Sequence, residues 1–230
     1  MRTGVLFIHG FTGAPFEVQP FVNFMKRETD WEIAVPTLPG HGITLSLGRA
    51  TAESWMMEAE LAMRKLQSEV DRVVVVGFSM GGLIAMYLSL RYPVAKLVLL
   101  SAAAKYISPR NLLGDMGIIL KESITKNYSP NTFYHLYAYK LTNTPPQATI
   151  EFLRIVKMVE PYYGLITAPV CIVQGAKDGI VPFSTAAHLF KVLGSSEKEL
   201  ITSDHGKHHI CYSDDSEEWF AKVLEFIKKE

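Results

Sequence analysis

One five-residue segment, at positions 77–81, constrains the fold of this chain more than any other feature. It reads Gly-Phe-Ser-Met-Gly and follows directly after four consecutive valines at 73–76. Glycines on both sides of Ser79 allow a buried strand to turn sharply into a helix, and such a turn projects the serine hydroxyl above the sheet. The turn also directs the first N–H groups of the helix toward a place where an oxyanion can form. The segment predicts a strand, a turn and a helix with Ser79 as a nucleophile; a Gly-rich structural turn is the alternative.

Strand-like and helix-like segments alternate along the chain. Short apolar runs, most without polar alternation, predict strands buried in a parallel sheet at 5–8, 32–35, 73–76, 97–100, 170–173 and 199–202. Helical patterns predict helices near 16–28, 52–68, 80–92, 184–193 and 216–229. Gly194 is expected to cap the end of the fourth helix and Ser216 the start of the fifth. Right-handed crossovers then give an α/β fold with a doubly wound, mostly parallel sheet of about six strands.

Composition narrows the class of protein. The 23 lysines and arginines balance the 23 aspartates and glutamates, so no net field favours nucleic acid or an anionic membrane. Two cysteines among 230 residues provide no disulfide framework. The chain has no apolar stretch of about 18 residues and no basic-then-apolar segment at its start. We therefore expect a cytoplasmic protein without stable membrane anchoring or nucleic-acid partners, either a monomer or a homodimer.

The segment 105–165 interrupts the alternation of strands and helices. It separates two predicted strands by far more residues than a simple crossover needs, and nine of its 61 residues are aromatic. A connection this long inside a compact domain is usually functional or contains helices of its own. Because it follows the carboxyl end of a strand, where the sites of α/β proteins lie, we expect a helical cap insertion at 105–165 on a core formed by 1–104 and 166–230. An insertion that only enlarges the core is the alternative.

Two later loops supply partners for a nucleophilic serine. A serine hydroxyl needs a base, and the base needs an acid that orients it. In sheets of this kind the acid and then the histidine follow the serine along the chain. Asp178 lies in the loop after the predicted strand 170–173, and three histidines, at 205, 208 and 209, follow the strand 199–202. Asp178 is therefore the candidate acid, and one of the three histidines is the candidate base.

Five motifs in this order resemble those of the α/β-hydrolases, in particular small bacterial carboxylesterases and monoacylglycerol lipases. They are Leu-Phe-Ile-His-Gly-Phe-Thr-Gly at 6–13, Pro-Thr-Leu-Pro-Gly-His-Gly at 36–42, the serine motif at 77–81, the loop at 175–182, and His208 before the last helix. The resemblance covers nearly the whole chain and implies the α/β-hydrolase fold. Many relatives have an antiparallel hairpin before the first motif, which here begins within a few residues of Met1. The sheet is therefore expected to be trimmed.

The resemblance implies specific roles for five residues. Ser79 would be the nucleophile, Asp178 the acid and His208 the base. The backbone N–H groups of Phe11 and Met80 would form the oxyanion hole, which agrees with their positions after the first strand and at the start of the helix after the serine. This chemistry needs no metal and no organic cofactor.

The histidines leave alternatives open. His208 fits the setting of the family's catalytic histidine best, but His205 and His209 are close enough in sequence to compete for the role. Closely spaced histidines can also bind zinc, although no carboxylate or thiolate pattern supplies the remaining ligands. His9 and His41 lie beside Gly-rich turns and are expected to support loops through hydrogen bonds.

The predicted activity is that of a serine carboxylesterase. The small cap leads us to expect hydrolysis of short- to medium-chain acyl esters or monoacylglycerols, as small-molecule substrates, through an acyl-enzyme intermediate. A thioesterase, a C–C hydrolase or a cofactor-free haloperoxidase could use the same three residues. A non-catalytic ligand receptor on a hydrolase scaffold is an alternative of another class.

Overall fold

Six parallel strands form the centre of the computed structural model, which describes residues 2–105 and 143–229. They are β1 (Thr3–Ile8), β2 (Glu32–Ala34), β3 (Arg72–Phe78), β4 (Lys96–Leu100), β5 (Val170–Gly175) and β6 (Lys198–Ser203). Their order in the sheet is β2-β1-β3-β4-β5-β6, and every neighbouring pair is parallel. The six predicted strands and the doubly wound α/β fold are confirmed.

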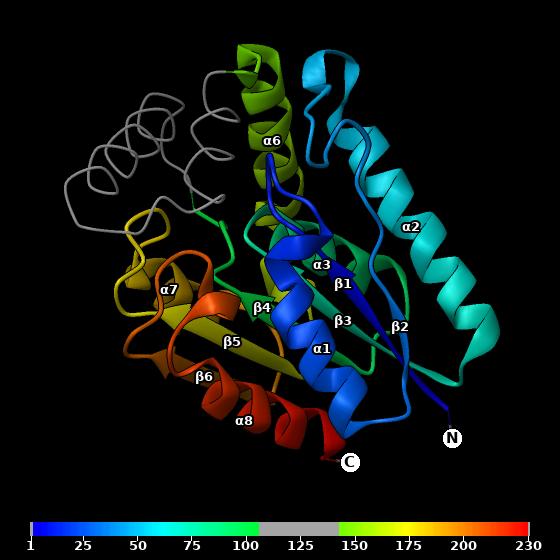
Figure 1. Ribbon diagram of the computed structural model, residues 1–230, viewed down its shortest axis with the longest axis vertical. Coiled ribbons are helices and arrows are strands. Elements are labelled where there is room, and N and C mark those ends of the chain that lie inside the picture. Colours follow the sequence, from blue (N-terminus) through cyan, green and yellow to red (C-terminus); the bar gives the residue numbers. More distant parts are fainter. Residues whose placement is uncertain (1, 106–142, 230) are drawn as a thin grey trace.

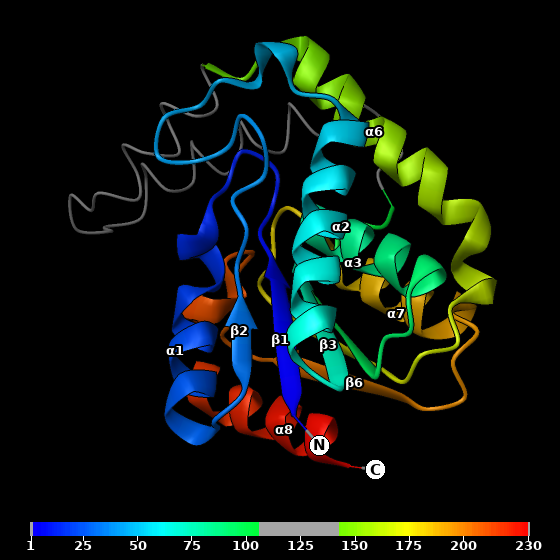
Figure 2. The ribbon, with the colours of Figure 1, turned by 90° about the vertical axis from the view of Figure 1, so that its right-hand side faces the viewer.

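Helices cover both faces of this sheet. Helix α1 (Gln19–Glu28), preceded by the 3₁₀ turn η1 (Pro15–Val18), lies with α8 (Ser216–Lys228) on one face. The other face is covered by α2 (Ala52–Glu69), α3 (Met80–Arg91), α6 (Pro146–Val159) and α7 (Phe183–Val192), as Figures 1 and 2 show together. Three further 3₁₀ turns are η2 (Leu47–Arg49), η3 (Glu160–Leu165) and η4 (Ile210–Tyr212). All five predicted helices are present.

The strands supply side chains to two hydrophobic cores, one on each face of the sheet. In β1, Val5 and Phe7 pack with residues of α1 and α8, whereas Leu6 and Ile8 pack with residues of α2, α3, α6 and α7. All residues of β1, β4 and β5 are buried, whereas the edge strands β2 and β6 are partly exposed. This explains why the central strands are continuous apolar runs in the sequence.

Two of the expected helix caps are wrong. Leu193 is the C-cap of α7, and Gly194 does not have the positive φ of a glycine cap. A glycine is needed there because a Cβ would lie 2.1 Å from the carbonyl oxygen of Gly164. At α8 the N-cap is Asp215 rather than Ser216, and the Asp215 carboxylate accepts a hydrogen bond from the hydroxyl of Ser203 at 2.6 Å. Gly194 and Asp215 both make contacts with residues distant in the sequence, and a local sequence pattern does not reveal such contacts.

The described part of the predicted cap, residues 143–165, contains α6 and η3 and packs against α2 and α3. Phe152 of α6 is buried in the core on the α2–α3 face. The buried Glu151 accepts a hydrogen bond from the N–H of Ala52, the first residue of α2, at 3.1 Å. Arg154 binds both Glu151 and the exposed Glu53. Residues 106–142 of the predicted cap lie outside the described residues, so its boundaries remain a prediction.

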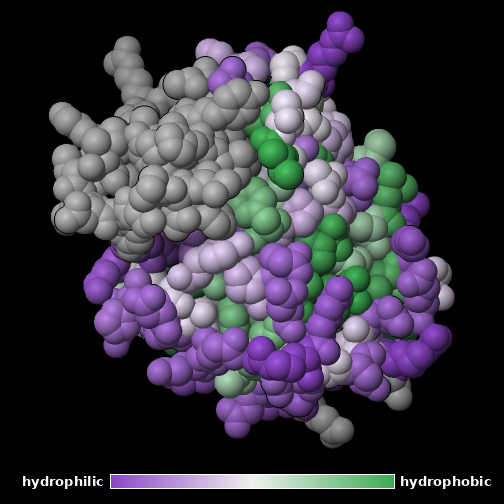
Figure 3. All heavy atoms as spheres, in the orientation of Figure 1, coloured by the Kyte–Doolittle hydropathy of each residue, from purple (hydrophilic) through white to green (hydrophobic). Residues whose placement is uncertain are grey.

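The surface combines charged and apolar regions. Hydrophobic residues gather over β2 and α2 on the face shown in Figure 3, where Met57 and Leu61 are exposed.

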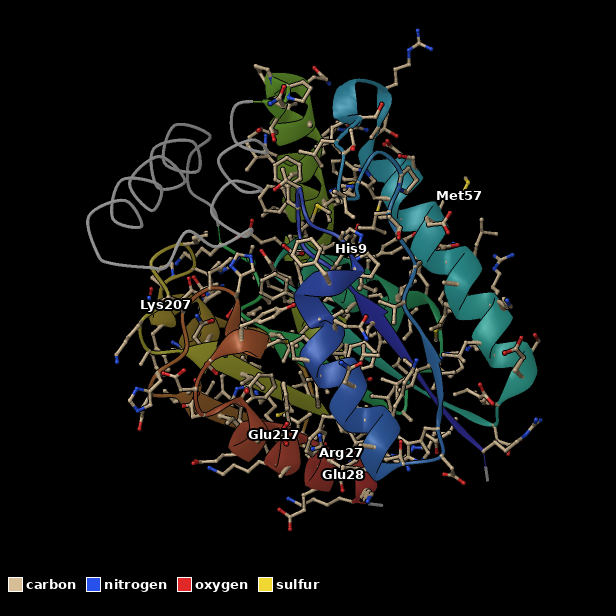
Figure 4. The ribbon with its side chains drawn as sticks, viewed as in Figure 1. His9, Arg27, Glu28, Met57, Lys207 and Glu217 are labelled. Atoms are coloured by element: carbon tan, nitrogen blue, oxygen red, sulfur yellow. The ribbon has the colours of Figure 1, made fainter. Side chains whose placement is uncertain are left out.

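Figure 4 shows Arg27 and Glu217 side by side where α1 meets α8, and the two side chains form an exposed ion pair at 2.7 Å. Within the described ranges, none of the helices has the length and apolar character needed to cross a membrane.

Candidate active site

Ser79 lies on a strained turn between β3 and α3. Its φ of 54° and ψ of −116° are unusual for a residue with a side chain. The two neighbouring glycines make this turn possible. A Cβ at Gly77 would lie 2.2 Å from the carbonyl oxygen of Gly81, and a Cβ at Gly81 would lie 2.2 Å from the carbonyl oxygen of Ile8. Any side chain at either position would force the backbone apart.

Hydrogen bonds to the adjacent strand hold this turn. The N–H of Ser79 donates to the carbonyl oxygen of Leu100 at 2.9 Å. The Ser79 carbonyl oxygen accepts from the N–H groups of Gly82 and Ala103, at 3.0 and 3.2 Å. The conformation of the serine is therefore fixed by β4 and α3 as well as by its own neighbours.

The structure brings Ser79, His208 and Asp178 together above the carboxyl ends of β3, β6 and β5. The Nε2 atom of His208 lies 3.1 Å from Ser79 Oγ, and its Nδ1 atom lies 3.0 Å from Asp178 Oδ2. All three side chains are largely buried, and that of Asp178 is fully inaccessible to solvent. This chain of hydrogen bonds is the arrangement in which an imidazole can accept the serine proton while a carboxylate orients the ring.

The Asp178 carboxylate is bound on all sides. Its Oδ1 accepts the N–H groups of Ile180 and Val181, each at 2.9 Å, and its Oδ2 accepts Nε2 of Gln174 at 3.0 Å as well as His208. Burial by itself raises the pKa of this carboxyl, but the charge and hydrogen bonding of His208 and the two N–H groups outweigh it and lower the pKa. Asp178 is therefore held ionised. Gln174 was not among the site residues predicted from the sequence, where its position at the end of β5 is the one signal for it.

The other two histidines of this loop face different partners. His205 is exposed, and its Nδ1 lies 3.5 Å from the ammonium group of Lys177. His209 directs Nε2 toward the carboxylate of Glu17 at 3.5 Å. Across residues 2–105 and 143–229, no three His, Cys, Asp or Glu side chains are grouped so that they could hold a metal ion.

The loop after β1, which contains Phe11, lies against the residues on either side of Ser79, because Gly10 approaches the Phe78 ring and the His9 carbonyl approaches Gly81. The Phe11 ring stacks on Phe152 of α6, with centroids 5.3 Å apart and planes 14° apart, and it also meets the Trp55 ring edge-on at 5.9 Å. Met80 is the first residue of α3 and is fully buried. The N–H of a first helical residue has no partner within its own helix, which leaves it available to a ligand.

His9 and His41 support the neighbouring loops, as expected. His9 lies at the end of β1 (Figure 4), and its Nε2 accepts the N–H of Leu38 at 3.0 Å. Nδ1 of His41 lies 3.2 Å from the carbonyl oxygen of Pro39, and the two imidazole rings are 5.2 Å apart. These contacts join the loop after β1 to the Gly-rich loop that follows β2.

Fold and site together define this protein as an α/β-hydrolase. Its residues 1–215 match the family described as serine aminopeptidase, S33, and the chain belongs to that family. It is 26% identical over 239 residues to a thermostable monoacylglycerol lipase of Bacillus sp. (strain H-257). This alignment spans 98% of this chain and 90% of the lipase. It is 24% identical over 231 residues to a pimeloyl-[acyl-carrier protein] methyl ester esterase of Vibrio vulnificus (strain CMCP6), with coverage of 89% and 87%.

The fold is shared with solved structures. One solved structure belongs to work on LipS and LipT, two metagenome-derived lipolytic enzymes. It superposes on this chain with a TM-score of 0.81 at 24% sequence identity, and the match spans 100% of this chain and 94% of the other. The predicted resemblance to α/β-hydrolases of the esterase and lipase type is confirmed, as is the prediction of an enzyme that hydrolyses carboxylic esters.

Proposed function

We propose that this enzyme is a serine carboxylesterase in which Ser79 is the nucleophile, His208 the general base and Asp178 the acid that orients it. The observation that carries the proposal is the continuous pair of contacts from Ser79 Oγ to His208 Nε2, at 3.1 Å, and from His208 Nδ1 to Asp178 Oδ2, at 3.0 Å. His205 instead approaches the ammonium group of Lys177, and His209 approaches the carboxyl group of Glu17.

The first half of the reaction forms an acyl-enzyme. Ser79 Oγ attacks the ester carbonyl carbon while its proton passes to Nε2 of His208. The carbonyl oxygen becomes an oxyanion, which the N–H groups of Phe11 and Met80 bind. Asp178 stabilises the imidazolium and fixes its orientation. The bond to the alcohol oxygen then breaks, and His208 returns its proton to the departing alcohol.

The second half releases the acid. Water attacks the acyl carbon, His208 accepts its proton, and the second tetrahedral intermediate collapses to give the carboxylic acid and free Ser79. Every proton in this cycle moves between the imidazole and a reacting oxygen. The chemistry therefore requires no metal ion or organic cofactor.

The substrates we propose are short- to medium-chain acyl esters or monoacylglycerols. Two relatives with a similar extent of alignment are named as a monoacylglycerol lipase and as a methyl ester esterase. The Phe11 ring, which belongs to a proposed oxyanion-hole residue, stacks on the apolar ring of Phe152, and an apolar surface of this kind suits an acyl chain. The segment proposed as a cap has about sixty residues, too few to enclose a long chain together with its glyceride.

A fluorophosphonate probe tests the nucleophile. We expect labelling confined to Ser79, and a Ser79→Ala variant that folds but loses at least about 10³-fold in kcat/KM. Ser89→Ala is the matched control, because the Ser89 hydroxyl bonds only to the carbonyl of Met86 among the described residues of α3. More than a tenth of wild-type activity in Ser79→Ala would exclude Ser79. A wild type that the probe leaves unlabelled would instead favour a non-catalytic receptor.

A substrate series tests the acyl pocket. Each buried methylene contributes roughly 0.8 kcal/mol, so kcat/KM for p-nitrophenyl esters should rise by up to about 15-fold per two carbons until the wall of the pocket is reached. A monotonic rise to sixteen carbons, or rapid hydrolysis of triolein, would identify a true lipase. Thioesters and C–C substrates measured in parallel separate the alternative hydrolase classes.

A further inference from the structure

Glu17, in the 3₁₀ turn η1, is a buried carboxylate that the mechanism above does not use. Its exposed fraction is 2%, although glutamate is rarely buried unless it is bonded. It lies close to the loop after β1, and its charge raises the pKa of the nearby, fully buried Cys211 thiol further than burial already does. Burying a polar group is costly unless it is hydrogen-bonded, so the contacts of Glu17 indicate what it holds in place.

One oxygen of Glu17 lies against the loop that presents Phe11. Oε2 accepts the N–H of Gly10 at 2.8 Å. A Cβ on Gly13 would lie 1.8 Å from the same oxygen, so the carboxylate occupies the space that a side chain at Gly13 would need. Between the two glycines, Thr12 has a φ of 58°, and the Gly13 N–H closes the turn on the Gly10 carbonyl at 3.1 Å. This hydrogen bond to a buried carboxyl group therefore holds a loop whose backbone conformation is strained at Thr12.

The other oxygen of Glu17 faces the histidine loop. Oε1 lies 3.5 Å from Nε2 of His209, the residue next to His208. A second contact joins the same two regions, because the hydroxyl of Tyr212 donates to the carbonyl oxygen of Phe16 at 2.6 Å. Glu17 thus touches both the loop of Phe11 and the loop of His208, on opposite sides of Ser79 in the chain.

We propose that Glu17 is a positioning residue, which fixes the orientation of the Phe11 N–H toward the reacting carbonyl by holding the neighbouring N–H of Gly10. This inference rests on the proposed function, since it assigns a support to the proposed oxyanion hole. Removing one donor from an oxyanion hole lowers kcat by about 10²–10³-fold. Loss of the support, with the donor retained, should cost roughly 10- to 100-fold in kcat and leave KM within about threefold.

The first experiment compares Glu17→Ala, Glu17→Gln and a control. Glu17→Ala should show the loss in kcat, whereas Glu17→Gln should recover to within about fivefold of wild type, because its amide oxygen can still accept the Gly10 N–H. Glu60 is the matched control, a largely buried carboxylate of α2 that accepts the hydroxyls of Tyr87 and Tyr92. Glu60→Ala should lower Tm without changing kcat. Equal kcat losses in the two alanine variants would overturn the proposal.

A second experiment separates positioning from a general loss of stability. A trifluoromethyl ketone forms a tetrahedral oxyanion on the serine, so its Ki should rise in Glu17→Ala by the same factor as kcat/KM falls. Gly13→Ala should displace the carboxylate and lower kcat in its own right, yet add little in the Glu17→Ala background, where the space is free.

The outcomes distinguish this proposal from the proposed function. If Ser79→Ala remains active, the assignment of the nucleophile fails whatever Glu17 does. If Ser79→Ala is inactive but Glu17→Ala and Gly13→Ala each keep kcat within twofold of wild type, only the positioning role of Glu17 is wrong. Should Glu17→Ala fail to fold, Gly13→Ala still decides, because it perturbs the contact while the carboxylate is retained.

Discussion

Replacing Asp178 with asparagine should inactivate the enzyme without unfolding it. The native carboxylate accepts two N–H groups on Oδ1, and the His208 ring and the Gln174 amide on Oδ2. In Asp178→Asn the amide oxygen is best placed on the two N–H groups, so the new NH₂ group faces His208. It then donates to Nδ1 and holds the ring as the tautomer with hydrogen on Nε2. That nitrogen can no longer accept the proton of Ser79.

The size of the effect follows from this geometry. In a serine protease with the same three roles, the wrong tautomer lowers kcat by about 10⁴-fold, which corresponds to roughly 5.5 kcal/mol in the activation barrier. The fold should suffer much less. The new NH₂ group also meets the Gln174 amide, which itself donates toward this position at 3.0 Å. One such mismatch costs about 1–3 kcal/mol, and each kcal/mol lowers Tm by roughly 2–4 °C in a chain of this size.

The assay compares Asp178→Asn with Asp204→Asn, an exposed aspartate beside the histidine loop. Hydrolysis of p-nitrophenyl butyrate measures kcat, and circular dichroism measures Tm. We expect a loss of 10³- to 10⁴-fold for Asp178→Asn and wild-type rates for Asp204→Asn. A kcat above a tenth of wild type in a folded Asp178→Asn protein would refute the tautomer argument. An equal loss in both variants would indicate a general effect on the loop.

Four other results should follow. His208→Ala should be nearly inactive, whereas His205→Ala and His209→Ala should each retain at least about a tenth of wild-type activity; an inactive His205→Ala would identify a different base. Activity should fall in acid, because a protonated imidazole cannot accept the serine proton, and a flat profile to pH 5 would contradict a histidine base. The pKa of Asp178 is lowered from its ordinary value of 3.8, so the stability that its charge contributes is fully present above pH 3.8 and is lost as the pH falls further. Melting curves should therefore show a loss of stability at lower pH than the loss of activity. Gly81→Ala should destabilise the fold by about 3 kcal/mol or more in urea unfolding, because its Cβ would lie 2.2 Å from a carbonyl oxygen of β1; a Tm within 2 °C of wild type would show that the turn adapts.

The sequence predicted most of the fold because strands buried on both faces leave an unmistakable pattern. The valines of β3 and the apolar run of β5 are typical of strands in a parallel sheet that helices cover on both faces. The order of Ser79, Asp178 and His208 along the chain was equally informative, and the structure brings these three residues together. Their catalytic roles remain the proposal made above.

Local patterns failed where a residue serves a distant contact. Gly194 is a glycine because the carbonyl of Gly164 lies against it, and Asp215 binds Ser203 twelve residues earlier. Neither partner is within reach of a helix-capping rule, which considers only a few residues along the chain.

The amino-acid sequence by itself determined the α/β fold, the strand-turn-helix at Ser79 and the set of candidate residues, because backbone propensity, burial and motif spacing are local properties of the chain. Only the tertiary structure decided which of the three histidines contacts the serine. It also decided that Gln174 binds Asp178 and that Glu17 binds Gly10. These are contacts between side chains and loops from different strands. Their distances depend on how the strands are ordered and twisted in the sheet, which no single segment of sequence specifies.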